Sequence, residues 1–213
     1  HHAKEVLLKL NESGIGYEFI SPFALRLSNS FKADQYFALD KEVVVQDLSS
    51  QRVGEFMELV RRRPSDQSLK VWDCCAGSGG KSIMAFDLNP EIDLTVSDIR
   101  ESILTNLKKR FKQAGIKKYK SFFADVVLHT LSPEEDFDVI IADVPCSGSG
   151  TWGRTPDQLI FFNTEKINEY AVLQKKIVFN AAQQLQSGGN LLYITCSVFR
   201  KENEDAVEFI KEK

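Results

Sequence analysis

The stretch LKVWDCCAGSGGK, residues 69–81, holds the clearest structural signal in this chain. Its first five residues, Leu69 to Asp73, have the composition of a β-strand, and a helical stretch follows from Ser82. Three glycines lie between them, where they let the backbone approach a ligand and adopt positive φ. A strand, a glycine-rich turn and a helix in this order are typical of a cofactor-binding loop in an α/β fold.

Acidic residues follow the next predicted strands. Asp98 lies 18 positions beyond Gly80, just after the apolar-rich run from Ile92 to Val96. Asp125 and Asp143 also follow apolar segments. A carboxylate at the tip of the second strand can accept both hydrogen bonds from a ribose diol, although each acid alone is explained equally well as a helix cap or a turn former. Their shared position indicates a cofactor that contains adenosine.

The loop itself distinguishes a dinucleotide from S-adenosylmethionine. A dinucleotide loop has G-x-G-x-x-G spacing and places a pyrophosphate at the helix N-terminus, whereas the order here is G-S-G-G-K. With Asp73 at the end of the first strand, four carboxylates surround one crevice, where they would repel a pyrophosphate but suit a cationic sulfonium and an adenine amino group. The residues therefore favour S-adenosylmethionine.

Two cysteines also follow predicted strands. Cys146 lies in DVPCSGSG, residues 143–150, and Cys196 lies in YITCS, residues 193–197. The carboxyl ends of parallel strands meet at one edge of the sheet, so we expect both thiols to face the same crevice. One thiol can attack a substrate and the other can help to reverse the attack, but the residues alone do not assign these roles.

Together these motifs resemble the Sun family of RNA cytosine-5 methyltransferases. The resemblance covers nearly all of the chain after about Lys41, and the order and spacing of the motifs agree with the family's. It implies a Rossmann-like methyltransferase fold, an α/β fold with a doubly wound and mostly parallel sheet. The matching segments are residues 45–51 (VQDLSSQ), 73–81, 98–100, 125, 143–151, 154–157 (RTPD) and 188–204 (GGNLLYITCSVFRKENE).

The resemblance also implies a reaction, in which S-adenosylmethionine donates a methyl group to carbon 5 of cytosine in RNA. Ribosomal RNA is the expected substrate. Carbon 5 is a poor nucleophile, and a thiolate added to carbon 6 turns the ring into an enamine that can attack a methyl sulfonium. By resemblance Cys196 is the attacking thiolate. Cys146 then assists release, which requires removal of the proton on carbon 5. Asp143 contacts the base in this scheme, by hydrogen-bonding or protonating the ring nitrogen.

Lys81 could favour the thiolate by its positive charge, because a thiol of pKa about 8.5 is only a few per cent ionised at neutral pH. The predicted catalytic residues are Cys196, Cys146, Asp143 and Lys81. The residues predicted to bind the cofactor are Cys75, Ala76, Gly77, Ser78, Gly79, Gly80, Lys81, Asp98, Arg100, Asp125 and Asp143.

Two other functions stay open at this level. The same chemistry could act on transfer RNA, or the chain could be a catalytically silent module that binds the cofactor and RNA. The presence of both Cys146 and Cys196 argues against silence, because a non-catalytic protein has no need of two aligned thiols.

The four cysteines are not expected to bind metal or to form disulfides. No C-x-x-C pair occurs, and two of the three histidines stand at the start of the chain. A secretory signal and an apolar run of membrane length are also missing from this sequence. We therefore expect a cytoplasmic protein with free thiols and neither a metal nor a membrane partner. A monomer is expected as well, although no residue pattern determines the oligomeric state.

Residues 1–44 are expected to form a small N-terminal part, with His1 and His2 as the remnant of a purification tag. Strands are expected between Tyr17 and Leu27, and the resemblance places a short RNA-contacting extension here. Residues 45–213 are expected to form the catalytic domain. The family usually adds a final pair of strands, so we expect either a fragment or a sheet shortened at one edge. The predicted helices are 49–63, 101–113, 165–185 and 202–210.

The net charge of −3 gives little support for an RNA substrate, since nucleic-acid-binding proteins are usually basic on at least one face. Basic clusters do occur, although runs of charge are more often solvated helix faces. An RNA-targeting domain elsewhere in a longer parent protein would reconcile the acidity with RNA binding. The clusters are residues 61–63, Lys108–Arg110 with Lys112, Lys117, Lys118 and Lys120, and Lys175 with Lys176.

Overall fold

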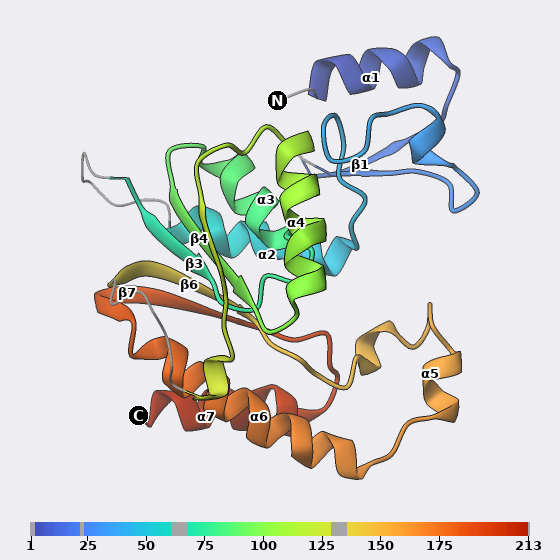
Figure 1. Ribbon diagram of the computed structural model, residues 1–213. Coiled ribbons are helices and arrows are strands. Elements are labelled where there is room, and N and C mark those ends of the chain that lie inside the picture. Colours follow the sequence, from blue (N-terminus) through green and yellow to red (C-terminus); the bar gives the residue numbers. More distant parts are fainter. Residues whose placement is uncertain (1–2, 22–23, 61–67, 129–135, 213) are drawn as a thin grey trace.

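A five-stranded parallel sheet forms the centre of the computed structural model, which describes residues 3–21, 24–60, 68–128 and 136–212 (Figure 1). Its strands are β3 (Lys70–Asp73), β4 (Asp93–Asp98), β5 (Lys120–Phe123), β6 (Phe137–Asp143) and β7 (Leu185–Ile194). The strand order is β5-β4-β3-β6-β7, and every neighbouring pair is parallel. The order reverses between β3 and β6, and such a switch point is where open α/β sheets bind ligands.

Helices cover both faces of this sheet (Figure 1). The helices after the N-terminal part are α2 (Leu48–Val60), α3 (Gly80–Leu88), α4 (Glu101–Gln113), α5 (Asp157–Ile160), α6 (Glu165–Ala182) and α7 (Glu204–Lys211), with 3-10 turns η2 (Val126–Leu128), η3 (Ser149–Thr151) and η4 (Arg200–Glu202). The first three helices pack on one face, whereas α6 and α7 pack on the other. The predicted doubly wound α/β fold is therefore confirmed.

The side chains of the inner strands alternate between two cores. In β6, Val139 and Ile141 join the core shared with α2, α3 and α4, whereas Ile140 and Ala142 join the core shared with α6. Because both faces of this strand are buried, its sequence is apolar almost throughout, as is usual for parallel sheets covered by helices.

The helix predictions succeed where an amphipathic stripe sets the boundaries. Helix α4 has the predicted bounds, and it buries Leu104, Leu107 and Phe111 at helical spacing. Helix α2 begins one residue before the predicted start, and the predicted residues 61–63 lie outside the described part of the chain.

The predicted ends of two other helices are wrong. Helix α6 stops at Ala182, because the chain enters strand β7 at Leu185 and pairs there with β6. The helix predicted from Glu202 begins at Glu204 instead. The backbone of Asn203 (φ −118°, ψ −92°) is not helical and separates η4 from α7.

The N-terminal part has a small core of its own. It consists of α1 (Ala3–Glu12), β1 (Glu18–Ser21), β2 (Ala24–Arg26) and the 3-10 turn η1 (Ala33–Gln35). The strands expected between Tyr17 and Leu27 are confirmed as an antiparallel pair. Val6, Leu10 and Phe37 are buried together, apart from the two cores of the large sheet.

Within the described residues, the helices are all too short or too polar to cross a membrane. The same part of the chain holds no group of three His, Cys, Asp or Glu side chains arranged to bind a metal ion.

Candidate active site

The loop between β3 and α3 forms the floor of the candidate cofactor site. Gly79 has a φ of +84°, and a Cβ atom at this position would lie 2.7 Å from Cε1 of Phe111 and 3.0 Å from Cγ of Leu107. Glycine therefore meets both a conformational and a steric demand here. Its presence lets the loop pack directly against α4.

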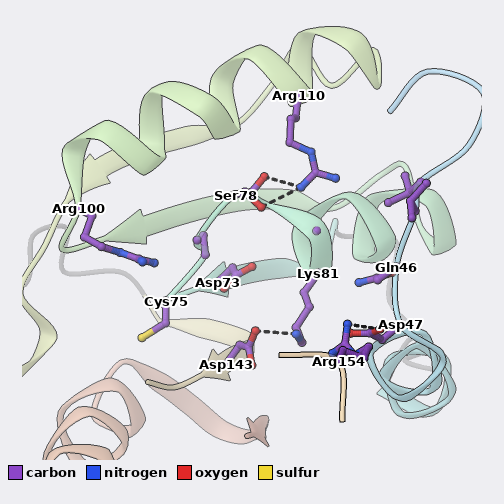
Figure 2. A pocket seen from close by; sticks show the side chains of 15 residues that line it. Gln46, Asp47, Asp73, Cys75, Ser78, Lys81, Arg100, Arg110, Asp143 and Arg154 are labelled. Carbon is purple, nitrogen blue, oxygen red and sulfur yellow. Dashed lines mark hydrogen bonds and ion pairs between the residues drawn. The ribbon is translucent and has the colours of Figure 1, made fainter. Parts of the chain in front are cut away.

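A cavity of about 490 Å³ lies beside this loop (Figure 2). Its volume is in the range of small-molecule sites. Eight of the residues predicted to bind the cofactor line it: Cys75, Ala76, Gly77, Ser78, Gly80, Lys81, Arg100 and Asp143. The lining also includes residues that were not among those predicted to bind the cofactor: Val44, Val45, Gln46, Asp47, Asp73, Arg110 and Arg154.

Asp98 does not line the cavity but binds two residues that do, Gly77 and Arg100. Its buried carboxylate accepts hydrogen bonds from the backbone N–H of Gly77 (2.9 Å) and of Arg100 (2.9 Å), and from Nε of Arg100 (3.1 Å). Burial acts to raise the pKa of Asp98, but the hydrogen bonds from Arg100 and Gly77 outweigh it and lower this pKa. A bound ribose would share Asp98 with Arg100, so the ribose role stays a prediction.

Two further predicted cofactor residues lie outside the lining. Gly79 packs against α4, as described above. Asp125 accepts a hydrogen bond from the backbone N–H of Val127 (3.0 Å) at the start of η2. This contact is the turn-forming use of an Asp side chain, and a cofactor role for Asp125 stays a prediction.

The segment of residues 40–47, which we call the strap, closes another side of the cavity. Arg110 on α4 binds both carboxylate oxygens of Asp40 at 2.6 and 2.8 Å and donates to the carbonyl oxygen of Ser78 at 3.0 Å. At the other end of the strap, Asp47 pairs with Arg154 at 2.7 Å (Figure 2). Asp47 and Arg154 stand in motifs that carry the family resemblance, whereas no motif marks Asp40, and Arg110 stands only in the basic cluster Lys108–Arg110.

Asp73, at the end of β3, is a buried acid on the cavity wall. Its Oδ2 accepts a hydrogen bond from Oγ of Ser82 at 2.6 Å, while Oδ1 is buried with no hydrogen-bond partner among the described residues. Burial raises the pKa of Asp73 to about 7, against the opposing effect of Ser82. Oδ1 of Asp73 can therefore accept a hydrogen bond from a ligand, and the carboxylate can pair with a positive charge on it.

Lys81 and Asp143 connect the cavity to the thiols. Nζ of Lys81 lies 2.6 Å from Oδ2 of Asp143 (Figure 2). Both side chains line the cavity, and both charges act on Cys196, where Asp143 raises the thiol pKa and Lys81 lowers it. Of these two opposing effects on the sulfur, that of Asp143 is the larger.

The two cysteines lie in contact although 50 residues separate them in the chain. Their Sγ atoms are 3.1 Å apart, and the backbone N–H of Gly150 donates to the carbonyl oxygen of Cys196 at 2.8 Å. The hydrogen bond from the Cys146 thiol lowers the pKa of Cys196 to about 7, although burial opposes it. The same hydrogen bond, together with burial, raises the pKa of Cys146. The two thiols therefore differ in the direction of their pKa shifts, which is downward for Cys196 and upward for Cys146.

Residues 41–213 match the family described as 16S rRNA methyltransferase RsmB/F. The chain belongs to this family. The expected Sun-family methyltransferase domain is thereby confirmed, and S-adenosylmethionine is the cofactor that membership in RsmB/F indicates.

RsmB/F relatives match most of the chain. The ribosomal RNA small subunit methyltransferase B of Xanthomonas campestris pv. campestris is 27% identical over 211 residues, which cover 96% of this chain and 46% of the relative. The protein of the same name from Salmonella paratyphi A is 32% identical over 166 residues, which cover 78% of this chain and 37% of the relative. The chain therefore spans less than half the length of these two relatives.

The crystal structure of PH0851 superposes on this chain with a TM-score of 0.85. The two are 27% identical, and the match covers 98% of this chain and 47% of the other. The expected Rossmann-like methyltransferase fold is thus confirmed by a solved structure as well as by the strand order.

Proposed function

We propose that this chain methylates carbon 5 of cytosine in RNA, with ribosomal RNA as the substrate, through a covalent adduct with Cys196. The contact between the sulfurs of Cys146 and Cys196, beside the cofactor cavity, carries the proposal. Methyl transfer to an atom that is already nucleophilic needs no thiol. Two thiols in contact suit a reaction in which one adds to a ring and the other helps to remove it.

Cys196 is suited to be the nucleophile. With a pKa lowered to about 7 by the Cys146 thiol, it is about half ionised at neutral pH, compared with a few per cent for an ordinary thiol. Its residue is exposed, whereas Cys146 is half-buried. In the reaction the Cys196 sulfur bonds to carbon 6 and the ring electrons move to carbon 5. Carbon 5 would then take the methyl group as the bond from this methyl to the sulfonium breaks and a neutral thioether leaves.

Cys146 is suited to act second. Its pKa is raised chiefly because its proton is shared with the Cys196 sulfur. Once that sulfur is bonded to the base, it no longer carries the charge that holds the proton. The Cys146 thiol can then lose its proton to solvent water, and the resulting thiolate accepts the proton from carbon 5 while the carbon–sulfur bond breaks and Cys196 leaves as a thiolate.

Lys81 and Asp143 act between the cofactor and the base in this scheme. Asp143 ends β6 three residues before Cys146, so its carboxylate can hydrogen-bond the pyrimidine edge. The side chain of Lys81 is only 12% exposed, and its ammonium group stabilises the negative charge that forms on the ring as the thiolate adds.

S-adenosylmethionine supplies an electrophilic methyl group on a sulfonium. The residues present fit this cofactor, because Oδ1 of Asp73 has no partner among the described residues and three acids, Asp47, Asp73 and Asp143, line the cavity. In our proposal Asp73 and Asp143 face the positively charged end of the cofactor. Asp98 and Arg100 hold the ribose.

RNA binding is proposed to use basic side chains outside the cavity. Lys108 and Lys109 on α4, together with Lys117 and Lys118, are exposed, whereas the predicted cluster 61–63 lies outside the described residues. The relatives are named ribosomal RNA methyltransferases, which favours ribosomal RNA over transfer RNA and a cytoplasmic site of action.

The covalent cycle can be tested with a cytosine-containing ribosomal RNA fragment. Cys146→Ser should attack the base but release it slowly, so a protein–RNA adduct should accumulate and survive denaturing electrophoresis. Cys196→Ser should give neither adduct nor product, because a serine hydroxyl is barely ionised without a dedicated base. Cys74→Ala is the matched control, since this buried cysteine lies outside both the cavity lining and the thiol pair.

Each outcome of this experiment is informative. An adduct that forms in the Cys146 variant and is lost in the double variant supports the proposal. An adduct that forms only in the Cys196 variant reverses the roles of the thiols. Binding of cofactor and RNA without adduct or product in any variant would favour the silent module. Loss of 5-methylcytosine from transfer RNA, rather than ribosomal RNA, in a deletion strain would support the other substrate.

A further inference from the structure

Two adjacent residues, Glu202 and Asn203, bind the chain on both sides of each active-site cysteine. Asn203 serves the Cys196 loop. Its Nδ2 donates to the carbonyl oxygen of Ser197 at 2.9 Å, and its Oδ1 accepts from Oγ1 of Thr195 at 2.5 Å. The residue before Cys196 and the residue after it are therefore fixed by one amide group.

Glu202 serves the Cys146 loop in the same way. Its Oε2 accepts from the backbone N–H of Ser147 at 2.8 Å and from Nε2 of Gln174 at 3.2 Å. The same Nε2 of Gln174 donates to the carbonyl oxygen of Pro145 at 3.0 Å. Directly and through Gln174, Glu202 thus fixes the residue before Cys146 and the residue after it.

The environment of Glu202 gives it little freedom to move. The residue is fully buried, as is Gln174, and the hydroxyl of Tyr193 lies 2.7 Å from the carbonyl oxygen of Glu202 and 3.1 Å from Oε1 of Gln174. Burying a carboxylate costs free energy, and Oε1 of Glu202 has no hydrogen-bond partner among the described residues. An apolar side chain would avoid this cost. What the carboxylate adds is its bond to the Cys146 loop.

We propose that the Glu202–Asn203 pair is the positioning element that sets the distance between the two thiols. The two residues share one peptide bond, so the loops that they bind cannot shift independently. The non-helical backbone of Asn203 points the two side chains to different loops. This inference rests on the proposed function, because the distance between the thiols matters for catalysis only if both thiols take part in the reaction.

The test measures the thiols without cofactor or RNA. The rate of Cys196 alkylation by iodoacetamide is followed against pH, with peptide mapping to separate the four cysteines. The charges of Asp143 and Lys81 also shift the pKa of Cys196, and none of the variants below changes either residue. We expect a midpoint near pH 7 in the wild type, and a rise toward the ordinary value of about 8.5 in Glu202→Met and in Asn203→Ala. At pH 7 this rise should slow alkylation roughly tenfold.

Conservative and matched variants separate positioning from general damage. Glu202→Gln keeps an oxygen to accept from Ser147, so it should retain the wild-type midpoint. Glu204→Gln changes an exposed acid next to the pair and should also leave it unchanged. If Glu202→Met does not fold, Gln174→Met, which removes the bonds to Pro145 and Glu202, should give the same rise.

A double variant gives the decisive readout. In a Cys146→Ala background the thiol donor is absent, so Glu202→Met should cause no further rise in the Cys196 midpoint. A wild-type midpoint in the folded Glu202→Met and Asn203→Ala proteins would overturn the proposal. So would an equal rise with and without Cys146. Because alkylation needs no RNA, a protein that positions its thiols as described yet forms no adduct would contradict the proposed function alone.

Discussion

Arg110 binds the carboxylate of Asp40, 70 residues earlier in the chain, through two nitrogen atoms. The same guanidinium donates to Ser78 in the cofactor loop. Asp40 has a φ of 61°, an unfavourable backbone conformation for a residue other than glycine. The bidentate pair therefore connects the strap to the floor of the cavity.

Arg110→Met should weaken S-adenosylmethionine binding roughly tenfold, about 1.4 kcal/mol, because it frees both the strap and Ser78. Calorimetry measures the change, and Lys112→Met, an exposed change on the same helix, is the control. Equal affinity in the wild type and a folded Arg110→Met protein would show that the strap does not depend on this pair.

Asp98→Ala should weaken S-adenosylmethionine binding by roughly 1.5 to 3 kcal/mol, the range for a hydrogen bond to a charged group. A cofactor analogue that lacks a ribose hydroxyl separates the direct role from the support of Gly77. If Asp98 binds the ribose, the analogue should lose affinity for the wild type but lose none for the variant. Unchanged binding of S-adenosylmethionine in a folded variant removes Asp98 from the site.

Asp73 should make stability depend on pH. Burial raises its pKa from 3.8 to about 7 in the folded state. Between about pH 4 and pH 7 the folded protein keeps a proton that the unfolded chain has lost, so stability falls as pH rises through this window. Asp73→Asn should flatten the fall in urea denaturation of the cofactor-free protein. Asp157→Asn, which changes an exposed acid, should leave the fall in stability unchanged. A fall as steep in Asp73→Asn as in the wild type would contradict the raised pKa of Asp73.

Gly79→Ala should destabilise the fold by about 2 to 4 kcal/mol, since the added Cβ combines an unfavourable φ with a contact of 2.7 Å to Phe111. Gly14→Ala is the control, because Gly14 has a φ of +64° but open space around its Cβ position, and it should cost only about 1 kcal/mol. Equal losses of thermal stability in the two variants would mean that packing on α4 contributes nothing.

The exposed lysines of α4 should contribute to RNA affinity through phosphate contacts. The logarithm of the affinity should then fall with the logarithm of salt concentration, at a slope of about −0.7 per contact. Lys108→Glu combined with Lys109→Glu should flatten this slope. Lys211→Glu, on α7 at the other face of the sheet, should leave it unchanged. A slope near zero in the wild type would place RNA docking in another part of a longer protein.

Much of the fold could be predicted from the sequence because its signals are local. The strand, glycine turn and helix of residues 69–88 follow from neighbouring residues, and the buried stripe of α4 marks both of its ends. The end of α6 could not be predicted, because its last turn competes with pairing between β6 and β7. Pairing between distant strands leaves no periodic pattern near Ala182.

The candidate site likewise has features that local sequence predicts and features that depend on tertiary contacts. The sequence by itself determined that Cys146 and Cys196 follow parallel strands, so both had to reach one edge of the sheet. Only the tertiary structure brought the two sulfurs into contact, and the opposite shifts of their pKa values depend on this hydrogen bond across 50 residues. Likewise, the pairing of Arg110 with Asp40 comes from packing the N-terminal segment on α4. Charge and hydrogen bonding act over a few ångströms in space, and the sequence records only separation along the chain.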